Sequence, residues 1–320
     1  MDQRGLGNSI PAGSSADDEY GLLDEPSWKL VDWTSLENRI MIDGMSIKYV
    51  DIGRGEPPTL LLHGIGASYR SWLTTIPTLS QKRRVIALDL PGFGSSNRTR
   101  IIPGAARSAR CVERVCQRLD LAQVDVVGHS MGGFFAMQFA HSYPRRVRKL
   151  VLVGTHLYSV LELYRRPIMA LVANTSLSLR FARQMVLAAI PAPRFVLEAI
   201  VDRPNLRKIL CSAFVIDAGK LDRDTLLETV SFGGSLNTLP TVAMGFAFRF
   251  DEVADSLTAT KAGKILVVAA DGDDLATPEE AEIFSARIGA AKLVVLSNAG
   301  HWAMLEQPKR LNRIIDGWLS

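Results

Sequence analysis

The sequence predicts an α/β protein in which a mostly parallel central sheet carries helices on both faces. Short apolar runs rich in Val, Ile and Leu recur at 59–64, 83–90, 121–128 and 149–154. Segments of helical length stand between them, for example 104–120. Strands that alternate with helices form parallel sheets covered by helices, because each helix carries the chain back to the start of the next strand.

The remaining elements follow in chain order. Residues 39–53 predict a β-hairpin, since two apolar-rich runs flank Asp43-Gly44, a pair that suits a tight turn. After Thr155 the alternation stops, and the residues up to about 250 predict helices broken by prolines. The alternation of strands and helices resumes at 263–302, and the chain ends in a helical segment. A helical insertion between two strands of one sheet accounts for this order.

These segments divide the chain into three parts. Residues 1–27 are rich in Gly, Ser, Asp and Pro and predict a flexible tail. Residues 28–155 and 251–320 form the predicted α/β core. Residues 156–250 form a predicted helical cap, inserted between strands 6 and 7 of the sheet.

The composition excludes several classes of protein. The chain has 320 residues, 47% of them hydrophobic, and its 37 basic and 33 acidic residues give a net charge of +4. The basic residues are spread out, without the clusters and aromatic platforms of a nucleic-acid site. No uncharged apolar run is long enough to cross a bilayer, and the N-terminus does not resemble a signal peptide. The three cysteines, Cys111, Cys116 and Cys211, lack C-x-x-C spacing and fit a reducing compartment, so we expect a soluble cytoplasmic protein.

The segment 126–133, "VVGHSMGG", carries the strongest chemical signal. It joins the end of an apolar strand to the start of a helical run and places Ser130 between Gly128 and Gly132. This is the G-x-S-x-G pattern in its strand–turn–helix context. A serine hydroxyl is a weak nucleophile, so it needs a base and a group that orients the base.

His301 is the best candidate for that base among five histidines. It follows an apolar strand in the loop "SNAGHW", and loops at strand ends are where catalytic groups gather in parallel sheets. The preceding strand ends in a turn that offers Asp271, Asp273 and Asp274. The resulting order, serine, aspartate, histidine, is that of the α/β-hydrolase triad.

With these residues, the sequence resembles the α/β-hydrolase superfamily, in particular its members that carry a cap. The resemblance runs from about residue 40 to the C-terminus. Its motifs stand in order: "LLHGIGAS", "VIALDLPGFGSS", "VGHSMGG", the aspartate turn and "NAGHW". One G-x-S-x-G is weak evidence, whereas five motifs in order are specific. The resemblance implies the α/β-hydrolase fold.

The resemblance also implies which carboxylate completes the triad. Family members commonly carry G-x-x-D with a proline four residues later, which favours Asp274, four residues before Pro278. Asp271 stands where the glycine is expected, so Asp273 stays open as the alternative.

Further roles come from the same resemblance. In the family, the oxyanion hole is formed by the N–H of the residue after the nucleophile, here Met131, and by one in the loop after the third strand, here Ile65. Four residues are expected to border the substrate: His63, Gly64, His129 and Trp302.

Triad and resemblance together imply a serine hydrolase that cleaves carboxylic esters, without metal or cofactor. The serine argues against haloalkane dehalogenases and epoxide hydrolases, which use aspartate. The apolar insertion fits a hydrophobic acyl or aryl ester. Two alternatives stay open: a carbon–carbon bond hydrolase of ring-cleavage products, and a non-hydrolytic cyclase or lyase of the same fold.

Overall fold

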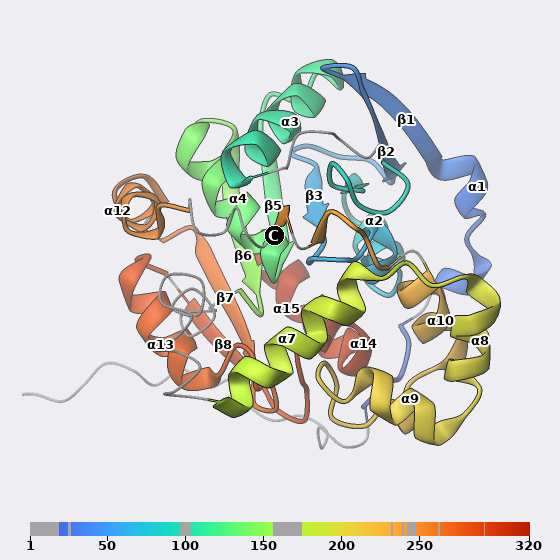
Figure 1. Cartoon of the computed structure of the whole chain (residues 1–320). Helices are drawn as coiled ribbons and strands as arrows, with labels where there is room; N and C mark the ends of the chain where they lie inside the picture. Colours follow the sequence, from blue (N-terminus) through green and yellow to red (C-terminus); the bar gives the residue numbers. More distant parts are fainter. Residues whose placement is uncertain are drawn as a thin grey trace, which may run out of the picture.

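The structure is a computed structural model. It describes residues 19–24, 27–96, 104–155, 175–231, 233–238, 240–241, 248–261, 263–290 and 292–320. Its centre is an eight-stranded sheet of order β1-β2-β4-β3-β5-β6-β7-β8 (Figure 1). The strands are β1 (Glu37–Ile42), β2 (Met45–Ile52), β3 (Thr59–Leu62), β4 (Val85–Leu88), β5 (Val124–His129), β6 (Val147–Val153), β7 (Ile265–Ala270) and β8 (Lys292–Leu296).

The sheet confirms the predicted α/β class. The strands from β3 to β8 pair in parallel, whereas β2 pairs antiparallel with both β1 and β4. Asp43 and Gly44 make the predicted hairpin turn, with φ of 49° and 78°. Both residues therefore adopt the left-handed backbone conformation that a two-residue hairpin turn requires.

The buried strands alternate between two apolar cores, because successive side chains of a strand point to opposite faces. Leu60 and Leu62 of β3 face one core, and Leu61 faces the other. The first core is covered by α3 (Ala105–Arg118), α4 (Met131–Ser142), α12 (Phe250–Lys261) and α13 (Pro278–Arg287). The second is covered by α2 (Ile76–Ser80), α14 (Ala303–Glu306) and α15 (Pro308–Leu319).

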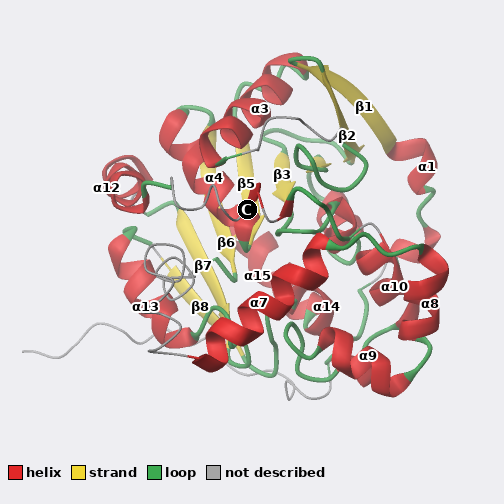
Figure 2. Ribbon diagram, in the orientation of Figure 1, coloured by secondary structure: helices red, strands yellow, loops and turns green. Residues whose placement is uncertain are grey.

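Helices fill the chain between β6 and β7, where the sequence predicts the cap. They are α7 (Thr175–Ala189), α8 (Arg194–Val201), α9 (Pro204–Cys211) and α10 (Arg223–Ser231), with the short turn η3 (Ala218–Lys220). Figure 2 shows them gathered together, away from α3, α4 and α12. Helix α12 packs on α4 and so belongs with the core. Residues 156–174 of the predicted cap lie outside the described residues.

The insertion is tied to the core by a partly buried ion pair. Arg70, in the turn η2 (Tyr69–Trp72), lies 2.5 Å from Glu228 of α10, and Arg194 of α8 contacts the other oxygen of that carboxylate at 2.8 Å. These contacts hold the insertion over the carboxyl ends of the strands.

The predicted flexible tail, residues 1–27, extends too far along the chain, because residues near its C-terminal end are held against the body. Residues 1–18 and 25–26 are outside the described residues, but Tyr20 is buried and Gly21 donates its N–H to the carbonyl of Glu306 at 2.7 Å. Trp28, in the turn η1 (Trp28–Leu30), donates its indole N–H to Thr225 of α10 at 2.8 Å. Aromatic burial therefore fixes these residues against the body.

No helix in the described ranges combines the length and the apolar character that crossing a bilayer requires.

Candidate active site

Ser130 lies at a sharp turn between β5 and α4. Its backbone has φ of 52° and ψ of −122°, an arrangement that a non-glycine residue rarely adopts. The neighbouring glycines allow it. A Cβ on Gly128 would lie 2.6 Å from the carbonyl oxygen of Gly132, and one on Gly132 would meet the backbone of β3. The strained serine at the end of a strand matches the predicted nucleophile elbow.

His301 pairs with Asp273, so the prediction of Asp274 is wrong. His301 Nδ1 lies 2.8 Å from Asp273 Oδ2, and both side chains are buried. The other oxygen of Asp273 accepts the N–H groups of Leu275 and Ala276, each at 3.0 Å. The turn thus fixes the Asp273 carboxylate toward the histidine, while Asp274 is exposed.

His129 holds the loop that carries His301. Its Nε2 lies 2.9 Å from the carbonyl oxygen of His301, and the two rings are 4.8 Å apart. A carbonyl can only accept, so Nε2 carries the proton. Burial and the neighbouring His301 lower the pKa of His129 to about 3, and the ring stays neutral. His129 borders the cavity described below, as expected, but its hydrogen bond serves the protein backbone.

His63 is not among the residues that line the cavity described below, contrary to the prediction. The side chain is completely buried; Nδ1 lies 2.7 Å from the Gly64 carbonyl, and Nε2 accepts the N–H of Leu90 at 3.0 Å. Both nitrogens are therefore used in joining the loops after β3 and β4. Burial lowers the pKa of His63 to about 4, so it acts as a neutral structural link.

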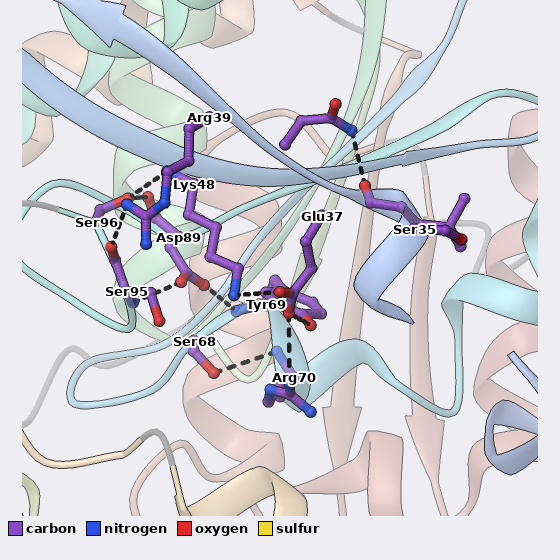
Figure 3. A network of polar contacts seen from close by, with 12 residues as sticks. Ser35, Glu37, Arg39, Lys48, Ser68, Tyr69, Arg70, Asp89, Ser95 and Ser96 are labelled. Atoms are coloured by element: carbon purple, nitrogen blue, oxygen red, sulfur yellow. Dashed lines mark hydrogen bonds and ion pairs between the residues drawn. The ribbon is translucent and has the colours of Figure 1, made fainter. Parts of the chain in front are cut away.

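A buried carboxylate fixes the loop that contains Ile65. Asp89, at the end of β4, accepts the N–H of Tyr69 at 2.8 Å and that of Ser95 at 2.7 Å (Figure 3). Burial raises its pKa to about 6. The same loop passes close to Ser130, because a Cβ on Gly64 would lie 3.4 Å from Ser130 Cβ. The loop after β3 is thereby held beside the elbow.

The oxyanion hole of Ile65 and Met131 stays a prediction. Ile65 lines the cavity, in the loop held beside Ser130. Met131 is the first residue of α4, and the N–H groups of a first helical turn have no acceptor in the helix itself. Such groups can receive a developing negative charge.

A cavity of about 110 Å³ separates these residues from the insertion. Ser130 and His301 line its floor, and apolar side chains of the insertion cover it: Ala188, Ile190, Ala192, Leu197, Leu210, Phe214 and Val230. Trp302 also lines it, stacked on Phe214 with ring centres 4.4 Å apart. Among the described lining residues there is no Lys, Arg, Asp or Glu. The cavity can therefore hold an apolar group against the serine.

No group of three or more His, Cys, Asp or Glu side chains in the described part of the chain is placed to hold a metal ion. The expectation of catalysis without a cofactor stays a prediction.

Comparisons with known proteins agree with this geometry. A family model described as "alpha/beta hydrolase fold" matches residues 57–201. The chain is 28% identical to a 2-hydroxy-6-oxo-2,4-heptadienoate hydrolase of Pseudomonas putida, over 88% of this chain and 95% of that protein. It is 37% identical to a 2-hydroxy-6-oxononadienedioate/2-hydroxy-6-oxononatrienedioate hydrolase of Escherichia coli, over 34% of this chain and 40% of that protein.

Two solved structures are similar over almost the whole chain. One is a meta-cleavage product hydrolase, with a TM-score of 0.67 and 21% identity, over 89% of this chain and 98% of that one. The other is a thermophilic esterase from Thermogutta terrifontis, with a TM-score of 0.63 and 25% identity, over 88% of this chain and 97% of that one. The similar proteins thus include both carbon–carbon and ester hydrolases.

Proposed function

We propose that the chain, as a member of the α/β-hydrolase superfamily, is a serine hydrolase of carboxylic esters with hydrophobic acyl or aryl groups. The observation that carries the proposal is one cavity whose floor holds Ser130 and the Asp273-paired His301 beneath apolar walls.

The reaction divides into acylation and deacylation. Ser130 Oγ attacks the ester carbonyl carbon, and His301 Nε2 takes the serine proton. Asp273 accepts the hydrogen bond of His301 Nδ1–H, which keeps the histidine in the tautomer with a free Nε2, and it stabilises the imidazolium that forms. The N–H groups of Ile65 and Met131 hold the negative oxygen of the tetrahedral intermediate. His301 then protonates the departing alcohol, and water releases the acid from Ser130 by the same steps.

The lining of the cavity favours a neutral substrate. The 2-hydroxy-6-oxo-dienoate named for the Pseudomonas putida protein is a carboxylate. Burying a carboxylate without a cationic partner is costly. None of the described lining residues is Lys or Arg, and most are apolar. An uncharged ester meets no such penalty.

Carbon–carbon bond hydrolysis is the second candidate, and a specific observation favours it. The similarity to the Pseudomonas putida hydrolase extends over nearly the full length of both chains. The two candidates differ in the charge that the substrate brings to the cavity.

A substrate panel tests the proposal. We expect para-nitrophenyl esters of neutral acids to be hydrolysed, with kcat lowered by several orders of magnitude in Ser130→Ala. A 2-hydroxy-6-oxo-2,4-dienoate is expected to react far more slowly than the best ester, measured as kcat/KM. The reverse order of the two substrates would reject the ester assignment in favour of the second candidate.

A further inference from the structure

Glu306 is a fully buried carboxylate that the proposed reaction does not use. It has no exposed surface, and no Lys or Arg of the described residues forms an ion pair with it. Its partners are three neutral donors: Tyr20 OH at 2.8 Å, the N–H of Ile216 at 2.7 Å and the N–H of Gly300 at 2.6 Å. Burying a carboxylate without a cationic partner costs free energy, which these three hydrogen bonds offset in part.

The three donors come from three separate parts of the chain. Tyr20 belongs to the N-terminal segment, Ile216 to the insertion, and Gly300 to the loop that carries His301. Gly300 directly precedes His301, so the Glu306 carboxylate is hydrogen-bonded to the backbone one residue before the proposed base. The contact is tight, because a Cβ on Gly300 would lie 3.2 Å from Glu306 Oε2.

Tyr20 completes this arrangement. Its hydroxyl donates to Glu306 and accepts the N–H of Asp217 at 2.8 Å. Gly21 donates its N–H to the Glu306 carbonyl. The N-terminal segment therefore connects Glu306 to the insertion through the Tyr20 hydroxyl.

We propose that Glu306 and Tyr20 are positioning residues that hold the 297–302 loop so that His301 Nδ1 faces Asp273. Neither side chain touches the reacting atoms; they act through the backbone at Gly300. The kinetic part of this proposal rests on the ester-hydrolase function, and its structural part does not.

The network should depend on pH. Burial, with the nearby negative charge of Asp273, raises the pKa of Glu306 to about 7, and its three donors oppose this rise. The ionised form accepts all three hydrogen bonds, whereas a protonated oxygen must itself find an acceptor. Acidification through this pKa therefore loosens the grip on the loop. Other titratable or charged groups near the network are Asp273, Cys211, Asp217 and Lys220.

Tyr20→Phe tests the proposal, because it removes one donor and leaves the ring. We expect kcat on the best ester to fall about tenfold, as for a misplaced catalytic group, with KM nearly unchanged. The acidic limb of the kcat profile should move to higher pH, since Glu306 loses a bond that favours its charged form. Thr225→Val is the matched control. It removes the Trp28–Thr225 hydrogen bond, which also joins the N-terminal region to the insertion but does not reach the 297–302 loop.

A proton NMR measurement gives a readout that needs no substrate. The His301 Nδ1 proton, shared with Asp273, should give a far-downfield resonance that His301→Gln abolishes. We expect this resonance to weaken in Tyr20→Phe and to persist in Thr225→Val. Glu306→Gln carries the same test should Tyr20→Phe not fold, since its amide places a donor against one of the N–H groups.

The outcomes separate the two proposals. If the wild type hydrolyses no ester, and the Nδ1 resonance seen in the wild type is lost in Tyr20→Phe, the ester function is rejected and the positioning role is supported. An active wild type whose resonance, kcat and pH profile are unchanged in Tyr20→Phe overturns the positioning role. So does a Thr225→Val variant that shows the same losses as Tyr20→Phe.

Discussion

At the scale of single residues, the chemistry depends on which carboxylate meets His301. The two candidates are adjacent in sequence, yet Asp273 is buried against the imidazole and Asp274 is exposed. Asp273 is fixed from both sides, by the histidine and by two backbone N–H groups of its own turn. A carboxylate held in this way needs no reorganisation when the imidazolium forms.

Replacing each aspartate by asparagine separates them. Asp273→Asn should lower kcat by about 10⁴-fold, because an amide favours the wrong histidine tautomer. Asp274→Asn should leave kcat close to the wild-type value. Ester hydrolysis at saturating substrate measures both, and a large loss in Asp274→Asn alone would return the role to that residue.

The sequence predicts this site only in part, and the error has a physical reason. Ser130 and His301 are found because their loops carry characteristic glycines and follow apolar strands. The choice between Asp273 and Asp274 depends on which side chain the turn directs inward, and spacing does not report that direction. The prediction that His63 borders the substrate fails for a similar reason. The sequence does not show that both ring nitrogens of His63 form hydrogen bonds with backbone groups.

At the scale of elements, the close approach of α4 to β3 positions Ser130, the proposed nucleophile. Gly132 lies in the first turn of α4, and a Cβ there would press on the carbonyl oxygens of Leu62 and His63. The glycine thus allows the helix N-terminus, with the N–H of Met131, to approach the loop after β3. The alternation of strands and helices and the hairpin turn at Asp43-Gly44 follow from periodicity and turn residues, and the structure confirms both.

Gly132→Ala tests this contact. We expect the variant to be destabilised by about 2 kcal/mol, because the added methyl forces α4 away from β3. Gly317→Ala is the control: its site in α15 is open, and alanine there should stabilise the protein by up to about 1 kcal/mol. Urea denaturation measures both free energies of unfolding. A Gly132→Ala variant as stable as the wild type would show that the contact is not required.

At the scale of the whole molecule, three parts of the chain meet at the carboxyl ends of the parallel strands. The core supplies the residues of the proposed triad, side chains of the insertion line the same cavity, and the N-terminal segment contacts the insertion through Tyr20 and Trp28. The polar, glycine-rich composition of residues 1–27 predicts a flexible tail, but Tyr20 within it is buried. Tyr20 and Glu306 are 286 positions apart, and no local pattern reveals a contact of that range.

Mass spectrometry of the protein quenched during turnover of a para-nitrophenyl ester shows directly whether a neutral ester acylates Ser130. We expect a mass increase of one acyl group, located on the peptide that contains Ser130 and missing in Ser130→Ala. Turnover of the ester with no acyl group on Ser130, or with the group on another residue, would contradict it.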